Sequence, residues 1–299
     1  MVRCLDESAV RKPGLFNIRS LQPFTYLGLL WWADVVHVQS SVGLLRCLHI
    51  VLAKLMGKKI ILTLHSHRPR HRLEHWLTRA ICRLPDTVVA VNDTIRAAVC
   101  PRAHVIPAYI VPGADEEAVA PDVLAWIGQV KGQGKRLVVS NAYKLIRFEG
   151  EDLYGLDLLI ELFSDSAVRR GHALLFVVSN LAGCEAAYTH YQQLIAERGL
   201  GESIWLLHRA MPFAGLLKHC DVSVRATNTD GDALSIRESL SYGKRTLASD
   251  CVARPRGSEL FKNRNLASLQ ATLLAAPAQH TAPDESFDGP IVNLYGKLS

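Results

Sequence analysis

Residues 227–250, TNTDGDALSIRESLSYGKRTLASD, contain acidic groups and a glycine where a β-rich run gives way to a helical one. Backbone amides at the start of a helix attract a phosphate, and Gly231 lets the backbone approach closely. Asp230 and Asp232 carry carboxylates, which accept hydrogen bonds from hydroxyl groups such as those of a sugar. The segment therefore predicts a site for a ligand that has both phosphate and hydroxyl groups.

Glu238 extends this pattern, because it follows Asp230 at a spacing of eight residues. If the helix begins near Ala233, Glu238 lies roughly 8 Å further along the helix axis, where it can reach a second set of hydroxyl groups, such as those of a ribose. A structural interpretation fits the same residues: Asp230 and Asp232 would cap the helix, and Glu238 would be a solvated helix residue. The residue types alone leave both interpretations open.

Short runs rich in Val, Ile and Leu alternate with longer amphipathic segments along the chain. In the first part we expect strands at 34–39, 58–65 and 86–92, with helices at 42–57 and 72–84. In the second part we expect strands at 136–141, 173–180, 203–208, 221–226 and 244–249, with helices at 155–165, 184–200, 212–220 and 233–243. Apolar strands of this kind are typical of parallel sheets that are covered on both faces.

The two series predict an α/β protein with two doubly wound, Rossmann-like domains that face each other across a cleft. We expect a first domain at 1–112, a linker with one short helix at 113–134, a second domain at 135–276 and a partly disordered tail at 277–299. Ligands of open α/β sheets bind beyond the carboxyl ends of the strands. The acidic segment after strand 221–226 falls at such an end.

The composition excludes several classes of protein. Hydrophobic residues make up 49% and charged residues 21% of the 299, which is typical of a globular protein and not of a disordered or fibrous one. No uncharged run reaches the roughly 18 residues of a membrane span, and no cleavable signal peptide is recognisable. Seven scattered cysteines without a CxxC pair favour reduced, buried thiols. We therefore expect a cytoplasmic protein that is at most peripheral to a membrane.

The net charge of +6 is unevenly distributed. Residues 1–112 contain 15 Lys and Arg against 6 Asp and Glu, whereas residues 113–299 contain 19 against 22. A basic first domain can face anionic lipid, a polyanionic substrate or nucleic acid, or it can simply be a solvated surface. Because no nucleic-acid recognition motif accompanies the charge, we expect no nucleic-acid partner.

The spacing Asp230-x7-Glu238 resembles the E-x7-E donor motif of retaining GT-B glycosyltransferases, the "glycosyl transferases group one" family. The residues in register with the family pattern E-G-F-G-L-x-x-x-E-A-x-A-x-G-x-P-V-I-A-S are Gly231, Leu234, Glu238, Gly243 and Ser249. The further run LASDCVARPRGSELF is similar to the branch that builds bacterial surface polysaccharides. Segments 34–67 and 141–163 also resemble family sections, so the resemblance covers about residues 34–265.

The resemblance implies that Asp230 contacts the donor sugar and Glu238 the nucleotide ribose. The donor-binding turn between them would be Gly231, Asp232, Ala233 and Leu234.

The family usually holds the diphosphate with an Arg and a Lys, the Lys directly before a Gly, but here Tyr154 precedes Gly155. Lys144 and Arg147 are the substitutes that we expect, with surface charge as the alternative. Arg225, at the end of strand 221–226, can approach a phosphate or form a structural ion pair.

The implied activity is the transfer of a sugar, with retention, from a nucleotide-diphosphate donor to a lipid-linked or oligosaccharide acceptor. Asp230 and His65, which ends strand 58–65, are the expected catalytic residues; His65 can instead be a hydrogen-bonded structural residue. We expect no metal and no cofactor, because cationic side chains can serve the leaving diphosphate. The expected location is the cytoplasm, with an anionic surface at the inner membrane face as a further partner.

Two other interpretations remain. The chain begins at MVRCLDESAV and has only Gly14 and Gly28 before residue 40, so the Gly-Gly loop that opens the family's first lobe is not found. It could therefore be a truncated, non-catalytic nucleotide-sugar-binding or partner protein. The order His71-x-x-Glu74-His75 matches that of the inverzincin metallopeptidases, although no third ligand is identifiable and a solvated basic helix is the favoured interpretation.

Overall fold

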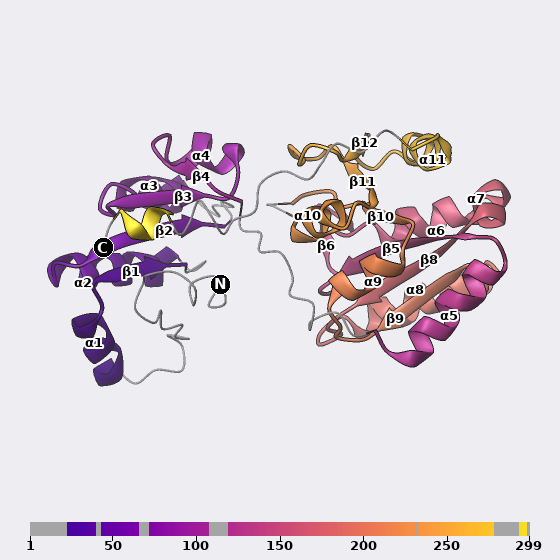
Figure 1. Cartoon of the computed structure of the whole chain (residues 1–299), viewed down its shortest axis with the longest axis horizontal. Coiled ribbons are helices and arrows are strands. Elements are labelled where there is room, and N and C mark those ends of the chain that lie inside the picture. The colour runs from indigo at the N-terminus through magenta and orange to yellow at the C-terminus, as the bar shows by residue number, and fades with distance from the viewer. Residues whose placement is uncertain are drawn as a thin grey trace. The chain divides into compact units, whose positions relative to one another are not determined.

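The computed structural model describes residues 23–39, 43–65, 72–107, 119–230, 233–277 and 293–297. The chain forms two compact units (Figure 1). Unit 1 comprises Met1–Ile110 together with Glu285–Ser299, and unit 2 comprises Val111–Asp284.

Unit 1 contains a parallel sheet with the strand order β1-β2-β3-β4. Its strands are β1 (Val35–Val38), β2 (Lys59–Leu64), β3 (Thr87–Ala90) and β4 (His104–Val105). Its helices are α1 (Pro23–Trp32), α2 (Gly43–Leu55), α3 (Arg72–Ile81) and α4 (Asp93–Val99). The three strands and two helices expected in this part of the chain are confirmed as β1 to β3, α2 and α3. Helices α1 and α4 and strand β4 were not expected.

Both faces of this sheet are covered, because successive residues of a strand point to opposite sides. Ile60 and Leu62 of β2 belong to a core that includes Ile50 of α2, whereas Ile61 packs with Leu294 near the C-terminus. Within the expected tail, residues 293–296 are helical and belong to unit 1. Leu294 is buried there.

Unit 2 contains a six-stranded parallel sheet with the order β12-β11-β10-β5-β8-β9. Its strands are β5 (Arg136–Ala142), β8 (His172–Val178), β9 (Ile204–His208), β10 (Val222–Arg225), β11 (Arg245–Ser249) and β12 (Glu259–Phe261). Its helices are α5 (Pro121–Gly132), α6 (Leu156–Ser164), α7 (Ser166–Gly171), α8 (Glu185–Glu197), α9 (Phe213–His219), α10 (Leu234–Ser241) and α11 (Leu266–Leu274). A hairpin of β6 (Arg147–Phe148) and β7 (Glu151–Asp152) follows β5. All five strands and four helices expected here are present.

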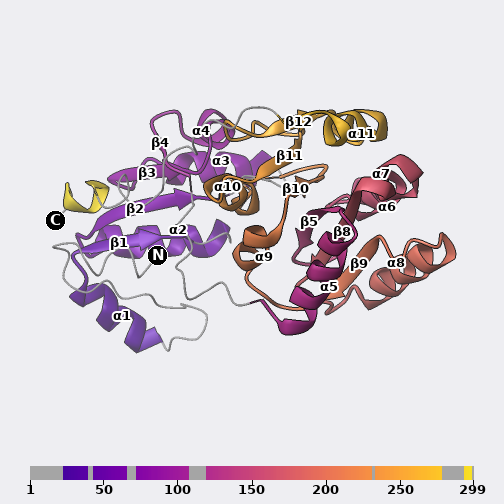
Figure 2. The same ribbon diagram turned by 45° about the vertical axis from the view of Figure 1, so that its right-hand side comes forward.

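Helices cover both faces of the second sheet, as Figures 1 and 2 show. Val138 of β5 packs into a core with Phe163 of α6, whereas its neighbour Val139 packs into another with Val123 of α5 and Leu216 of α9. Strand β5 lies in the middle, with β8 and β9 on one side and β10, β11 and β12 on the other. The direction of winding therefore reverses between β5 and β10, which is the ligand-binding position in doubly wound sheets.

The segment expected to be a linker contains α5, and this helix is part of unit 2. Val123, Ile127 and Val130 are buried at helical spacing against the sheet. Residues 119–134 are therefore a layer of the second unit, because these three side chains supply an apolar face that must be covered.

Candidate functional site

A pocket of about 300 Å³ opens at the carboxyl ends of β5 and β10 in unit 2. It is thus at the point where the strand order reverses. The residues that line it are Asn141, Tyr143, Tyr154, Phe213, Arg225, Asp230, Ala233, Leu234, Ser235 and Glu238. The pocket therefore brings Asp230 and Glu238 to one site, together with the N-terminal turn of α10.

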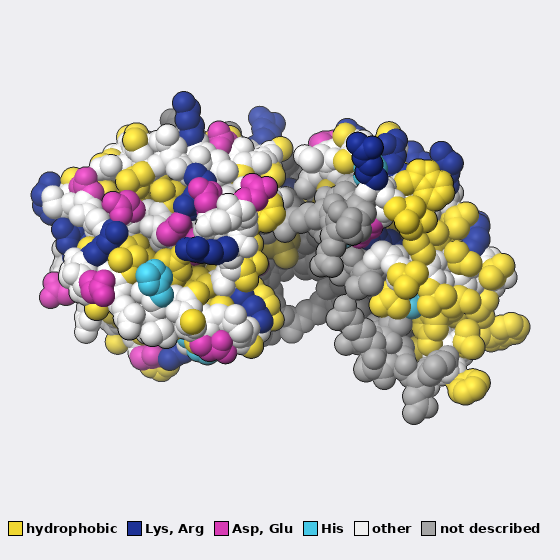
Figure 3. Space-filling view, turned by 180° about the vertical axis from the view of Figure 1, so that it is seen from behind, with side chains coloured by type: hydrophobic (Ala, Val, Ile, Leu, Met, Phe, Trp, Pro, Cys, Tyr) yellow, Lys and Arg dark blue, Asp and Glu magenta, His cyan; other side chains and the backbone are white. Residues whose placement is uncertain are grey.

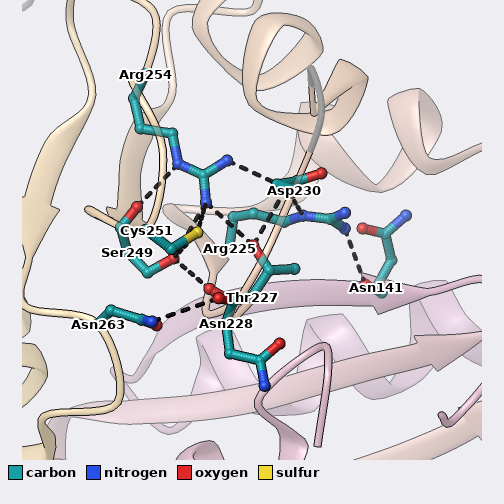
Figure 4. A network of polar contacts seen from close by, with 9 residues as sticks. All are labelled: Asn141, Arg225, Thr227, Asn228, Asp230, Ser249, Cys251, Arg254 and Asn263. Carbon is teal, nitrogen blue, oxygen red and sulfur yellow. Dashed lines mark hydrogen bonds and ion pairs between the residues drawn. The ribbon is translucent and has the colours of Figure 1, made fainter. Parts of the chain in front are cut away.

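Asp230 is the centre of a buried polar network (Figure 4). Its Oδ2 accepts a hydrogen bond of 3.1 Å from each of Arg225 Nε, Arg254 and the Thr227 hydroxyl. Burial by itself raises the pKa of Asp230, but the two arginines outweigh it and hold this pKa below the ordinary 3.8. Asp230 is therefore ionised and is bound to two cations.

Arg254 fixes this network from the side of β11. Its side chain is only 2% exposed and donates to the Ser249 carbonyl oxygen at 2.8 Å and to the Thr227 hydroxyl at 3.0 Å. Figure 4 shows Arg254 and Arg225 reaching Asp230 from different directions. Because Arg254 is not among the pocket-lining residues, its role is to hold Asp230 and the loop that carries it.

Arg225 is a cation that does line the pocket. Its guanidinium carbon lies 5.0 Å from the ring centroid of Tyr154, and its second contact besides Asp230 is the carbonyl oxygen of Asn141 at 3.4 Å. Stacking on an aromatic face and pairing with a carboxylate both restrict the orientation of an arginine. The side chain is thus held at the carboxyl end of β10 with its charge in the pocket.

The turn before α6 positions Tyr154. The Asp152 carboxylate accepts from the amides of Tyr154 and Gly155 at 2.7 and 3.0 Å. Gly155 has φ +71°, and a Cβ there would lie 2.3 Å from the carbonyl oxygen of Ala226. Only glycine fits this close approach, which brings the turn against the residue that follows β10.

Glu238 faces the pocket from the second turn of α10 and is half-buried. Burial raises the pKa of its carboxyl above the ordinary 4.5. Among the described residues, no hydrogen-bond donor or cation is recorded on this carboxylate. It is thus an acceptor group directed at the pocket, in contrast to the paired Asp230.

The other expected donor-site residues differ in position. Ala233 and Leu234 line the pocket, whereas Gly231 and Asp232 lie outside the described residues.

Lys144 and Arg147 are not among the residues that line the pocket. Lys144 is half-buried, and its Nζ donates to the Ala182 carbonyl oxygen at 2.5 Å. Arg147 lies exposed on β6. Arg225 of β10, which was also considered from the sequence, lines the pocket and forms an ion pair with Asp230.

His65 belongs to unit 1, directly after β2. It is exposed, and its Nε2 lies 3.2 Å from the Oε1 of Gln39, which follows β1. His37 of β1 is bonded to the Thr63 hydroxyl at 2.7 Å and to the Tyr295 hydroxyl. Burial, aided by His65, lowers the pKa of His37 to about 4. The catalytic role of His65 stays a prediction.

Asn141, Ser235 and Arg254 are site residues that the sequence reasoning missed. Two of these could have been found from the sequence: Asn141 lies at the carboxyl end of the expected strand 136–141, and Ser235 lies in the first turn of the expected helix 233–243. Arg254 could not have been found in this way, because its partner Asp230 lies 24 residues away and no local sequence pattern joins the two residues.

No group of three or more His, Cys, Asp and Glu that suits a metal occurs among the residues the structure describes. His71 of the alternative metallopeptidase motif lies outside them; Glu74 and His75 are in α3. Within the same described part of the chain, no helix has both the length and the apolar character needed to cross a membrane.

Comparison with solved structures identifies the fold as GT-B, the two-unit Rossmann-like fold of many glycosyltransferases. HepE of Anabaena, crystallised with UDP and glucose, matches with a TM-score of 0.63 and 14% identity over 83% of this chain and 69% of that one. A glycosyltransferase from Rickettsia africae matches with a TM-score of 0.63 and 16% identity over 86% of this chain and 72% of that one. Sucrose-phosphate synthase from Thermosynechococcus elongatus matches with a TM-score of 0.62 and 15% identity over 92% of this chain and 72% of that one. The expected fold class is confirmed.

Residues 9–117 match the model of Glycosyltransferase Family 4. This match covers much of unit 1, whereas the pocket described above lies in unit 2. No curated protein sequence matches the chain.

Proposed function

We propose that this protein is a glycosyltransferase whose unit 2 pocket binds the nucleoside diphosphate of an activated sugar. The family match over residues 9–117 and the GT-B fold support the activity. The observation that carries the proposal is the pocket itself, which joins the fixed cation of Arg225 to the Glu238 carboxylate, for which the described residues provide no ion pair or hydrogen bond.

Arg225 would bind the diphosphate. Its guanidinium is always charged, and its planar set of donors matches phosphate oxygens. Asp230 accepts one hydrogen bond from its Nε, and two arginines share this single carboxylate, so the network keeps an excess of positive charge. The N-terminal turn of α10, at Ala233, Leu234 and Ser235, adds backbone amides that favour an anion.

Glu238 would accept hydrogen bonds from the ribose. An ionised carboxylate only accepts hydrogen bonds, so vicinal hydroxyl groups are suitable partners, and among the described residues none forms a hydrogen bond with this carboxylate. Binding a ribose would then offset the cost of keeping this carboxylate ionised in a half-buried position. Asp230, whose carboxylate also lines the pocket, is the proposed contact of the donor sugar.

For the mechanism, we extend the proposal to a retaining transfer without a metal ion. Departure of the nucleoside diphosphate develops negative charge on the leaving oxygen, and a preorganised cation such as Arg225 stabilises that charge. The phosphate that leaves would take the proton of the acceptor hydroxyl while the new glycosidic bond forms. The proposed acceptor is a lipid-linked or oligosaccharide chain of a surface polysaccharide, on the basis of the sequence resemblance.

A thermal-shift screen with UDP-, GDP- and ADP-sugars tests the proposal, with UDP-glucose first because HepE was crystallised with UDP and glucose. We expect one nucleotide class to raise the Tm of the wild type but not of Glu238→Ala or Arg225→Ala. Arg147→Ala is the matched control, because this exposed arginine does not line the pocket. Stabilisation that survives in both pocket variants would contradict the proposed site; binding without sugar transfer would favour the non-catalytic alternative.

A further inference from the structure

Helix α2 carries apolar residues on the face that it turns to solvent. Its buried face contains Arg46, His49, Ile50 and Ala53. Its exposed large hydrophobic residues are Leu44, Leu48, Val51 and Leu55, which recur at the spacing of one helix face. A helix on the surface of a water-soluble domain ordinarily shows polar residues there. This reversal indicates that the outer face of α2 meets something other than water.

The neighbouring helices extend this apolar face. Helix α1 is joined to α2 by the Tyr26–His49 hydrogen bond of 2.6 Å, and α3 also lies against α2. The exposed apolar residues of α1 are Phe24, Leu27, Trp31 and Trp32, and those of α3 are Leu73, Trp76 and Leu77. Figure 3 shows hydrophobic side chains gathered over one face of unit 1, at the right of the view. We call these residues of α1, α2 and α3 the apolar face.

Three of the five tryptophans of the chain belong to the apolar face. Trp31 is 79% exposed and Trp76 is 63% exposed. Tryptophan is the side chain that gathers at membrane–water interfaces, because its ring is apolar and its indole N–H reaches polar groups.

Basic residues accompany the apolar face. The exposed charges on α1, α2, α3 and the residues that follow them are Asp34, Lys54, Lys59, Arg72, Arg79, Arg83 and Asp86, so five of the seven are positive. One of the two acidic residues, Asp86, is paired with Lys54 at 3.6 Å. Lys58 reaches back to the Trp31 carbonyl oxygen at 2.8 Å, so its amine lies beside the tryptophans. The apolar face is therefore complementary to a surface that is apolar inside and anionic at its rim.

We propose that the apolar face is a docking surface for an anionic lipid bilayer, in which α1, α2 and α3 lie in the plane of the headgroups. Amphipathic helices with aromatic and leucine side chains on one face and Lys or Arg beside them bind membranes in this way. The tryptophans and leucines enter the acyl boundary, and the basic residues contact lipid phosphates. This docking does not depend on the function proposed for the pocket of unit 2.

Vesicle co-sedimentation of the full chain without nucleotide tests this surface. The vesicles contain phosphatidylcholine alone or phosphatidylcholine with one third phosphatidylglycerol. We expect strong binding to the anionic vesicles, weaker binding to the neutral ones, and weakening by salt. The double variant Trp31→Gln with Trp76→Gln should bind anionic vesicles at least roughly tenfold more weakly. Both residues are exposed, so the fold should be retained, and circular dichroism checks this.

Leu260→Gln with Leu274→Gln is the matched control, because both leucines are exposed on unit 2. This variant should bind vesicles like the wild type. Arg79→Glu with Arg83→Glu should lower binding to anionic vesicles by roughly tenfold or more and leave binding to neutral ones unchanged. Brominated lipid should quench the tryptophan fluorescence of the wild type far more than that of Trp31→Gln with Trp76→Gln.

Three results would overturn the proposal. The first is sedimentation that the tryptophan changes do not reduce. The second is no sedimentation with either vesicle type. The third is a concentration-dependent dimer that the tryptophan changes dissociate, in the absence of vesicle binding, which would assign the apolar face to a second copy of the chain. Donor binding, measured separately by thermal shift, is expected to be equal in all of these variants.

Discussion

Arg225 stacks on Tyr154, with its guanidinium carbon 5.0 Å from the ring centroid, and both side chains line the pocket of unit 2. Tyr154 stands before Gly155, where the sequence resemblance leads one to expect a lysine. The positive charge at the pocket therefore comes from the end of β10, and the tyrosine supports it from the turn before α6.

The first prediction concerns Arg225 itself. Arg225→Ala should weaken nucleoside-diphosphate binding by about 10- to 100-fold, because a hydrogen bond to a charged group contributes about 1.5–3 kcal/mol. Arg225→Lys should recover only part of the loss, since an ammonium cannot stack on Tyr154 or bind two oxygens with a planar fork. Isothermal titration calorimetry with UDP, GDP and ADP measures this. Equal affinity of Arg225→Ala and the wild type would refute it.

The second prediction concerns the ion-paired Asp230. Asp230→Asn leaves Arg254, whose side chain is 2% exposed, without its countercharge. Removing one partner of a buried ion pair costs about 3–5 kcal/mol, so the free energy of unfolding should fall by an amount near this range. Denaturant unfolding measures it. The control is Asp122→Asn, which breaks the solvent-exposed pair of Asp122 with Arg209 and should change the free energy of unfolding far less.

The pH dependence of Asp230 has a defined sign. Its pKa is below 3.8 in the folded state, so its stabilising contribution is fully present above that value and is lost as the pH falls through the lower, folded-state pKa. Asp230→Asn should therefore reduce the acid sensitivity of unit 2. An unchanged acid transition would mean that Asp230 is not held ionised by the two arginines.

The third prediction is a pH dependence of donor binding through Glu238. Its pKa lies above 4.5 because of burial, and the ribose would bind the ionised form. Nucleotide affinity should therefore decline as the pH falls toward and through this raised pKa, with proton release on binding in that range. Titration calorimetry in buffers of different ionisation enthalpy detects the proton. Glu238→Gln should bind more weakly and lose this part of the pH profile.

Much of this architecture was readable from the sequence because buried parallel strands are continuous apolar runs. The expected strand at 173–180 corresponds to β8, whose seven residues are all buried. Strand β12 was missed, since it has three residues, one of them charged, and depends on pairing with β11. Helix α5 was expected but was assigned to a linker, because the glycines and prolines around it are typical of linkers. Its apolar face of Val123, Ile127 and Val130 instead packs in unit 2.

The site was predictable only where its residues are close in sequence. Asp230, Ala233, Leu234 and Glu238 share one strand-to-helix segment, and all four line the pocket. Of the cations named from the sequence, Arg225 lines the pocket whereas Lys144 and Arg147 do not, because which residue reaches the pocket depends on the order of β5 and β10 in the sheet. That order is a tertiary property with no local signal.

The fourth prediction concerns the turn that carries Tyr154. Gly155→Ala combines a φ of +71° with a Cβ only 2.3 Å from the Ala226 carbonyl oxygen, so it should destabilise unit 2 by well over 2 kcal/mol. Gly183→Ala is the control, because φ is +79° there but no atom lies within 4 Å of the added Cβ. That change should cost only about 1–2 kcal/mol. Thermal unfolding compares the two, and equal losses would argue against the close approach.

The fifth prediction concerns His37 in unit 1. Burial is the main cause that lowers its pKa from 6.5 to about 4. Between pH 4 and pH 6.5, His37 therefore binds a proton in the unfolded chain but not in the folded one. Stability of unit 1 should therefore fall as the pH drops from about 6.5 to about 4, by on the order of 3 kcal/mol from this group. Unfolding of His37→Gln should be less acid-sensitive. His104→Gln, at an exposed position, should behave like the wild type.

A crystal structure of the protein with UDP tests the central claim most directly. The account predicts the diphosphate within hydrogen-bonding distance of the Arg225 guanidinium and the ribose hydroxyls on the Glu238 carboxylate, at the carboxyl ends of β5 and β10. A nucleotide bound elsewhere, with Arg225 and Glu238 untouched, would contradict it.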